Sequence, residues 1–406
     1  MKKASFLRSL ATAACLLALV TSHAQAETGV TDTSIKIGMF GPLSGNSMAY
    51  GFDVINAAKM YYDKVNKEGG VDGRKIELVI EDDRCNANDL LAAVKKLVEH
   101  DQVFMLNGGG CSAAVTAARE YVDRAQVPWV MQAASGDGAL YPPSRYIFGA
   151  LSISQYAVGG SIVEFASQYL KAKKIGYINH DDAYGSWNLE AAQFQAKKNG
   201  VELNVQSINP SITDVTAPML KIRSANPDVL LILTYDRPAS LLVKKAYELG
   251  FTKPIVIAVN GTADTKQLAS NVGNKDAFKN VYTQGLLADV PGGPKLKWVY
   301  DMYKSYYPDL AAQPGHPTTY MPEGVTPVKV IVEALKTAGR DLTREKLVDA
   351  LERTNLDTGI TAGPIVFTPT DHAGQKSSIY LKFDGENETL LPGTYTSAWT
   401  YKAAAK

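Results

Sequence analysis

The sequence predicts an α/β protein made of two doubly wound parallel-sheet lobes with a ligand cleft between them. Short apolar runs typical of strands alternate with segments of helical period, and this alternation starts again after Tyr146. The last third differs, because several helices follow one another there before three short strands. Strands separated by helices of about ten residues or more form parallel sheets that are covered on both faces.

The first series of elements begins with a strand from Ser34 to Phe40 and a helix from Ser47 to Lys67. Its remaining expected elements are strands over 75–80 and 103–106 and helices over 88–100 and 112–125. The second series has expected helices over 155–170, 184–198, 215–224 and 239–249, and expected strands over 174–178, 201–206, 228–233 and 254–257. Each series predicts one sheet.

The final third contains expected helices over 295–307, 320–338 and 344–352, then strands over 364–367, 378–383 and 397–401. Helices grouped so late in the chain must cover one of the two sheets, which makes that lobe discontinuous. We expect one lobe from residues 27–151 plus 285–358 and the other from 152–284 plus 359–406, with three crossings between them. The cleft would then be lined by strand carboxyl ends and helix N-termini, where open α/β sheets bind ligands.

Length and composition exclude several classes of protein. The chain has 406 residues, 46% of them hydrophobic, with 42 Lys+Arg against 41 Asp+Glu. A charge balance near zero argues against a nucleic-acid-binding surface, so we expect no nucleic-acid partner. No apolar run reaches the roughly 18 residues of a membrane span.

The N-terminus is typical of a cleavable signal peptide. Lys2, Lys3 and Arg8 precede a short apolar stretch, and A-x-A ends at Ala26, so we expect cleavage there and export to the periplasm. A lipoprotein signal ending at Cys15 is disfavoured, because the apolar run continues past it. Cys85 and Cys111 remain in the mature chain, and one pair in an exported protein indicates a structural disulfide, with two unpaired buried thiols as the alternative.

Motifs of catalysis and of metal or nucleotide binding are mostly missing from the sequence. The run G-G-G-C-S at 108–112 follows a strand and opens a helix, but it has no phosphate-loop lysine. It suits a carboxylate at a helix N-terminus, although Ser112 could simply be an N-cap. His180-Asp181-Asp182 has no further ligands for a metal, and Glu81-Asp82-Asp83-Arg84 is most simply a solvated strand exit. We therefore expect no enzyme, no metal and no cofactor.

Several segments together resemble the leucine/isoleucine/valine-type periplasmic binding proteins, the solute receptors of ABC importers. They are I-K-I-G-M-F-G-P-L-S-G (35–45), G-G-V-D-G-R-K-I-E-L-V (69–79), D-D-R-C (82–85), G-G-G-C-S, V-P-W-V (127–130), D-D-A-Y-G (181–185) and G-P-I-V-F (363–367). The segments follow the family order over essentially the whole mature chain. The resemblance implies the type I two-lobed fold and a disulfide between Cys85 and Cys111.

The resemblance also implies a set of ligand-binding positions. Ser112 corresponds to the group that holds the ligand's carboxylate, and Ala133 and Ser135 fall where the family supplies another N–H and hydroxyl, to within one residue. Three tyrosines complete the expected site: Tyr50 over the ligand side chain, and Tyr184 and Tyr235 from the other lobe. For each tyrosine the alternative is ordinary core or surface packing.

Departures from the family pattern bear on the ligand. Acidic positions that would face an amino-acid ammonium fall at Ser154 and Asn260, which are neutral, although Asp236 or Asp181 could compensate. We therefore expect a small carboxylate without an α-amine, an aromatic or phenylpropanoid acid, with Tyr156 or Trp187 as additional aromatic contacts. A branched-chain amino acid receptor and a urea or amide receptor of the same family are the alternatives.

The resemblance implies a monomeric receptor that captures its ligand by lobe closure and is recognised by the membrane permease subunits of an ABC importer. A sensor for amides, an extracellular ligand-gating module and a secreted hydrolase on the same scaffold are the rival functions.

Overall fold

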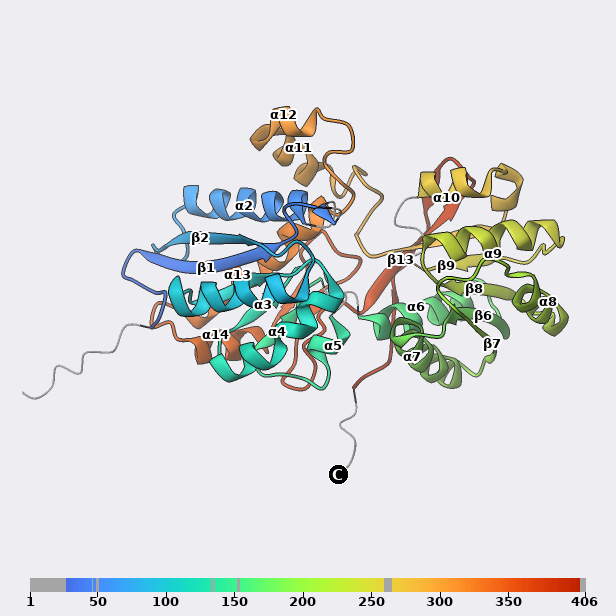
Figure 1. Ribbon diagram of the computed structural model, residues 1–406, viewed down its shortest axis with the longest axis horizontal. Coiled ribbons are helices and arrows are strands. Elements are labelled where there is room, and N and C mark those ends of the chain that lie inside the picture. Colours follow the sequence, from blue (N-terminus) through green and yellow to red (C-terminus); the bar gives the residue numbers. More distant parts are fainter. Residues whose placement is uncertain are drawn as a thin grey trace, which may run out of the picture.

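Two sheets organise the computed structural model, which describes residues 27–45, 47–48, 51–132, 134, 136–151, 154–258 and 265–401. Figure 1 shows the two lobes side by side, with the elements of the first series on the left and those of the second series on the right. The predicted α/β fold with two lobes is confirmed. Within the described residues no helix is both long enough and apolar enough to cross a membrane.

The first sheet is entirely parallel, with the order β2-β1-β3-β4-β5. Its strands are β1 (Ser34–Gly41), β2 (Lys75–Asp82), β3 (Met105–Gly108), β4 (Trp129–Met131) and β5 (Ile147–Gly149). Helices α2 (Phe52–Lys67), α3 (Ala87–Lys95), α4 (Ser112–Ala125) and the short α5 (Asp137–Leu140) connect them, and a π-helical turn, Lys96–His100, extends α3. The strand order changes direction at β1, because β2 lies on one side of β1 and β3, β4 and β5 follow on the other side. The connections that leave β1 and β3 therefore run toward opposite sides of the sheet.

The second sheet is mixed. Its order is β14-β13-β10-β9-β8-β6-β7, and β15 pairs with β13. The parallel strands are β6 (Lys174–His180), β7 (Glu202–Ile208), β8 (Val229–Leu233), β9 (Ile255–Ile257) and β10 (Val281–Gly285). The C-terminal strands β13 (Ser377–Phe383), β14 (Glu388–Leu390) and β15 (Tyr395–Thr396) pair antiparallel. The expected strand over 397–401 was therefore misplaced, since β15 ends at Thr396.

Helices cover the second sheet, four of them where the alternating pattern predicts and one, over 265–272, where the sequence analysis expected none. They are α6 (Gln155–Gln168), α7 (Ala183–Asn199), α8 (Thr216–Ala225), α9 (Asp236–Glu248) and α10 (Thr265–Val272), with a 3-10 turn, Lys275–Phe278, after α10. Asp182 caps α7 by accepting a hydrogen bond from the Gly185 N–H at 2.9 Å. This cap fixes where the helix begins relative to the end of β6.

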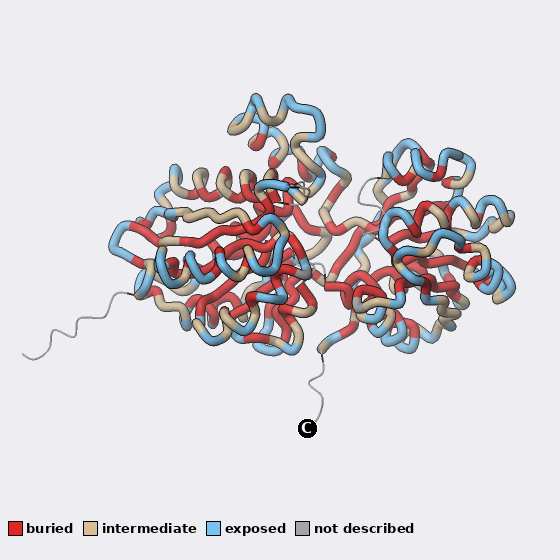
Figure 2. Tube along the Cα trace, in the orientation of Figure 1, coloured by how far each residue is buried: buried red, intermediate tan, exposed pale blue. Residues whose placement is uncertain are grey.

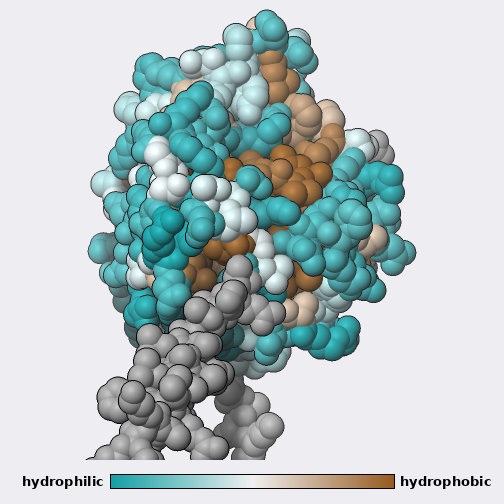
Figure 3. Space-filling model, turned by 90° about the vertical axis from the view of Figure 1, so that its left-hand side faces the viewer, coloured by the Kyte–Doolittle hydropathy of each residue, from teal (hydrophilic) through white to brown (hydrophobic). Residues whose placement is uncertain are grey.

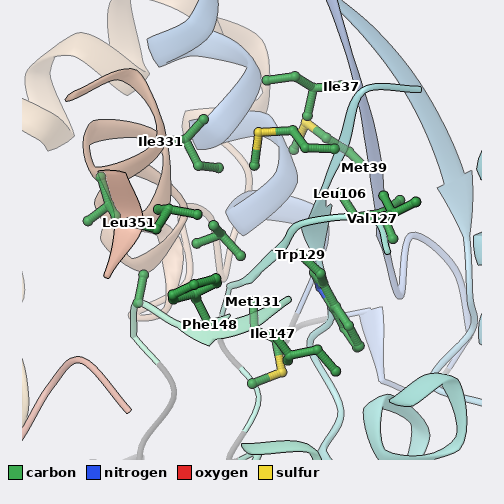
Figure 4. Close-up of a cluster of buried hydrophobic side chains, with 14 of the residues drawn as sticks. Ile37, Met39, Leu106, Val127, Trp129, Met131, Ile147, Phe148, Ile331 and Leu351 are labelled. Carbon is green, nitrogen blue, oxygen red and sulfur yellow. The ribbon is translucent and has the colours of Figure 1, made fainter. Parts of the chain in front are cut away.

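The late helices return to the first lobe. They are α11 (Lys297–Tyr306), α12 (Pro308–Ala311), α13 (Val325–Ala338), which follows a 3-10 turn Met321–Gly324, and α14 (Arg344–Leu351). In Figure 4, Ile331 of α13 and Leu351 of α14 face the same buried cluster as Trp129 and Phe148. The first lobe is therefore built from two separated parts of the chain, as the position of these helices in the sequence predicts.

The chain stays with the first lobe beyond the expected boundary at residue 358. After the short pair β11 (Asn355–Leu356) and β12 (Ile365–Val366), Phe367 and Ala373 still belong to the first hydrophobic core. The Gly149 N–H donates to the His372 carbonyl at 2.8 Å, which extends the edge of the first sheet. The precise lobe boundaries and the number of crossings stay predictions.

Burial follows the layers of the fold. Figure 2 shows the strands of both lobes mostly buried, while many turns of the outer helices are exposed. Every residue of β1 is buried except the partly exposed Lys36, as expected for a strand covered on both faces. The surface seen from the left of Figure 1 is mainly hydrophilic, with apolar side chains in a central strip (Figure 3).

Candidate functional site

The first wall of the candidate site is built where β3 leads into α4. Gly108 is required there, because a Cβ at this position would lie 2.4 Å from the Phe40 carbonyl oxygen of β1. Cys111 is the N-cap residue of α4, and Ser112 is the first helical residue and is exposed. The first N–H groups of a helix lack intrahelical acceptors, so this end of α4 can hold an anion. Ser112 is thus the first helical residue and not the N-cap.

A disulfide between Cys85 and Cys111 ties this helix start to the loop after β2, with the two Cα atoms 5.5 Å apart. The expected pairing is confirmed. Arg84 and Cys85 both have positive φ angles, of 46° and 61°, so this turn is locally unfavourable for L-residues. The disulfide and the buried Asp83, which accepts a hydrogen bond from the Cys85 N–H at 2.8 Å, hold it in place.

The acidic run over 81–84 is not simply a solvated strand exit. Asp83 is fully buried, and this burial raises the pKa of its carboxyl to about 6. Asp82 accepts hydrogen bonds from the Leu43 N–H at 2.9 Å and from the Ser44 hydroxyl at 2.5 Å. The two carboxyl groups therefore organise the β1–α2 loop and the disulfide turn, both of which follow the carboxyl ends of strands in the first sheet.

Reduction of the disulfide is expected to destabilise the first wall. A bridge between residues 26 positions apart contributes about 3 kcal/mol on the chain-entropy model. The double variant Cys85→Ser/Cys111→Ser should therefore unfold at a lower denaturant concentration than the wild type. Its free energy of unfolding should be lower by about 3 kcal/mol. Urea titration with and without reductant measures it. Unchanged unfolding of the variant would show that the bridge does not constrain the chain.

The second wall is an aromatic cluster at the carboxyl end of β6 and β8. The ring centroids of Tyr184 and Tyr235 are 5.0 Å apart, and the His180 ring lies 4.5 Å from Tyr235 and 5.8 Å from Tyr184. Tyr184 is buried, whereas Tyr235 keeps 43% of its surface exposed. The structure thus brings the two tyrosines expected from the second lobe together, and it adds His180, which the sequence analysis did not expect in the ligand site.

The three acidic residues beside this wall differ in their positions and in their exposure to solvent. Asp182 is the cap of α7, and Asp236 lies in the first turn of α9, where a helix N-terminus favours a negative charge. Asp181 is exposed. The described residues contain no group of three or more His, Cys, Asp or Glu side chains arranged to hold a metal ion.

Ser154 lies beside a buried carboxyl group that the sequence analysis did not identify. Ser154 is the N-cap residue of α6, and the next N–H, that of Gln155, donates to Asp137 Oδ2 at 2.6 Å. Asp137 is almost fully buried, and burial, with a smaller contribution from Asp371, raises the pKa of its carboxyl to about 7. Asp137 lies in the short helix α5, two elements before α6, and comes close to Ser154 only in the folded chain. The sequence therefore carries no recognisable signal for this pair.

Tyr156 and Trp187 do not join the aromatic wall. Tyr156 stacks on Trp399 with ring centroids 3.6 Å apart, and Tyr141 of the first lobe contacts both rings at 5.5 Å. Trp187 packs against this same cluster. Both residues therefore pack where the chain enters α6, and their contact with the ligand stays a prediction.

Four of the expected site residues, Tyr50, Ala133, Ser135 and Asn260, lie outside the described residues. Their proposed roles stay predictions. The described part of the site is therefore the start of α4, the loop after β2, the buried Asp137–Ser154 pair and the aromatic wall.

Comparison with known proteins shows the family to which the chain belongs. Residues 34–387 match the family model described as periplasmic binding protein. An amino acid binding protein from Pseudomonas aeruginosa is 26% identical over 69% of this chain and 73% of its own length. The Leu/Ile/Val-binding protein homolog 7 of Brucella abortus is 25% identical over 86% of this chain and 88% of its own.

Solved structures share the fold. A putative branched-chain amino acid ABC transporter protein from Rhodospirillum rubrum superposes with a TM-score of 0.74 at 20% identity, covering 88% of this chain and 100% of that one. A fatty acid ABC transporter substrate-binding protein from Thermomonospora curvata gives a TM-score of 0.66 at 22% identity, covering 92% and 95%. The chain therefore belongs to the periplasmic binding protein family, whose members act on the periplasmic or extracellular side of the membrane.

Proposed function

We propose that this receptor binds a small carboxylate, an aromatic or phenylpropanoid acid, and delivers it to the permease subunits of an ABC importer. The observation that carries the proposal is the aromatic second wall of His180, Tyr184 and Tyr235. Aromatic side chains bury a flat apolar ligand through stacked and edge-to-face contacts. The start of α4 supplies the N–H groups for the carboxylate.

Capture would proceed by closure of the lobes. Ser112 and Tyr235 are both exposed, so each wall can receive the ligand from solvent. A ligand that contacts both walls favours the closed state by its additional contacts there. The protein would act as a monomer after cleavage of the signal peptide at Ala26.

Thermal unfolding of the purified, ligand-stripped mature chain tests the proposal. A ligand present at 100 times its Kd stabilises the native state by about 2.7 kcal/mol. We expect benzoate- or cinnamate-type acids to raise the melting temperature, and leucine, isoleucine, valine and urea to leave it unchanged. A shift with leucine and none with any aromatic acid would overturn the ligand proposal while leaving the transport role intact.

A branched-chain amino acid receptor is the second candidate, and Asp137 favours it. Its buried Oδ1 has no hydrogen-bond partner among the described residues, and it lies beside Ser154, where the family pattern places an acid. A ligand ammonium could recruit this carboxyl as its counter-charge. If Asp137 has that role, Asp137→Asn abolishes the thermal shift with leucine. If the ligand is an aromatic acid, the variant keeps its thermal shift with that acid.

A further inference from the structure

Polar atoms without partners gather beneath the aromatic wall. Both ring nitrogens of His180 have no hydrogen-bond partner in the part of the chain that the structure describes, and the Tyr184 hydroxyl interacts with the side chain of Asn188. His180 and Asn188 are fully buried, and Tyr184 keeps only 8% of its surface exposed. Buried polar groups normally have hydrogen-bond partners, so two unpartnered ring nitrogens beside a tyrosine hydroxyl point to a polar ligand atom.

His180 is a neutral imidazole in this environment. Burial lowers the pKa of its ring, and the nearest carboxylate oxygen, Asp182 Oδ2, lies 3.9 Å from Nδ1, beyond hydrogen-bond distance. The other oxygen of Asp182 is engaged in capping α7. A neutral imidazole offers one N–H donor and one acceptor, and the Tyr184 hydroxyl can both donate and accept.

Tyr235 stands between these groups and solvent. Its ring meets the His180 ring nearly edge to face at 4.5 Å, yet 43% of the residue is exposed. It occupies the N-cap position of α9, outside the helix proper. A side chain so exposed at a helix entry can change rotamer far more cheaply than the buried His180 or Tyr184. Rotation of Tyr235 would open the polar groups to a ligand.

We propose that His180 and Tyr184 form a polar recognition site for a hydroxyl or carbonyl oxygen at the end of the ligand opposite its carboxylate. The ligand class is then a hydroxylated aromatic acid, such as a hydroxybenzoate or a hydroxycinnamate. This inference rests on the proposed function, because it assumes that the aromatic wall holds the ligand ring.

The consequence is selectivity for the substituted acid. A pocket built to hydrogen-bond a hydroxyl rejects the analogue without it, because its buried polar groups then stay unpaired. One or two neutral hydrogen bonds at about 1 kcal/mol each correspond to a preference of roughly 5- to 30-fold.

Isothermal titration of the mature protein with paired ligands tests this. We expect 4-hydroxycinnamate to bind at least about 5-fold more tightly than cinnamate, and 4-hydroxybenzoate more tightly than benzoate. His180→Phe should reduce this ratio to below about threefold. Tyr184→Phe, which removes only one oxygen, should also lower the affinity ratio. It is the test variant to use if His180→Phe does not fold.

His372→Phe is the matched control. His372 is also buried, but it stacks on Phe148 in the first lobe with ring centroids 3.9 Å apart, so its replacement should keep the wild-type ratio. Binding of both acids with equal affinity by the wild type, or an unchanged ratio in both test variants, would overturn the inference alone. Binding of leucine with no binding of any aromatic acid would overturn the proposed function as well.

Discussion

Glu323→Gln is expected to make the protein more stable than the wild type at pH 9 while leaving stability near pH 4 unchanged. Glu323 is buried in the 3-10 turn before α13, and burial alone raises the pKa of its carboxyl to about 8. In the unfolded chain this carboxyl ionises near its ordinary pKa of 4.5. The folded state therefore binds the proton more tightly, and wild-type stability falls as the pH rises from about 4.5 to about 8.

Glutamine resembles the protonated acid and does not titrate, so the stability of the variant does not fall with rising pH through this residue. The stability difference between the two proteins should grow across that pH window and level off above pH 8, at a few kcal/mol. Urea unfolding at pH 4, 6, 8 and 9 measures it. The other buried carboxyl groups, Asp83 and Asp137, are present in both proteins and cancel in the difference.

The exposed Glu333 of α13 provides the control, since Glu333→Gln removes no buried group. This control should show no stability difference that grows with pH. A constant difference between Glu323→Gln and the wild type across the whole range would mean that the carboxyl is hydrated in the native state and that the turn is not packed as described.

The sequence predicted the fold well where the relevant information was local. Apolar runs and helical periodicity located the strands and helices around both sheets, because each element must bury one or both faces along its own length. The sequence analysis did not predict short elements such as β5, of three residues, and α5, of four. So few positions show no measurable periodicity of apolar residues. The antiparallel pairing of β13 with β10 joins segments far apart in the chain, such as Val281 with Phe383, and it was not anticipated.

The candidate site was predictable in part for the same reason. The resemblance identified Cys85 and Cys111, Tyr184 and Tyr235, because these follow recognisable segments. Burial of Asp83, Asp137 and His180 is a property of the folded arrangement, and acidic runs in a sequence look solvated until neighbouring elements cover them. Buried polar groups are therefore the part of the site that the structure contributes beyond the sequence.

Gly185→Ala is expected to disrupt the second wall more than any surface change. A Cβ at residue 185 would lie 1.8 Å from the carbonyl oxygen of His180 and 2.6 Å from its carbonyl carbon. Both atoms belong to the backbone at the end of β6, so no side-chain rotation relieves the clash. The start of α7 must move away from β6, which breaks the cap from Asp182 to the Gly185 N–H and displaces Tyr184 from Tyr235 and His180.

Overpacking typically lowers the free energy of unfolding by about 1–3 kcal/mol. Because the clash is with backbone atoms, we expect a loss of about 3 kcal/mol or more. The variant should melt below the wild type and lose the thermal shift produced by the ligand. Gly41→Ala is the matched control, because its Cβ would meet only the Ile55 side chain at 3.4 Å, an ordinary contact. If Gly185→Ala kept both the melting temperature and the ligand response of the wild type, the contact between β6 and α7, and with it the geometry of the aromatic wall, would be wrong.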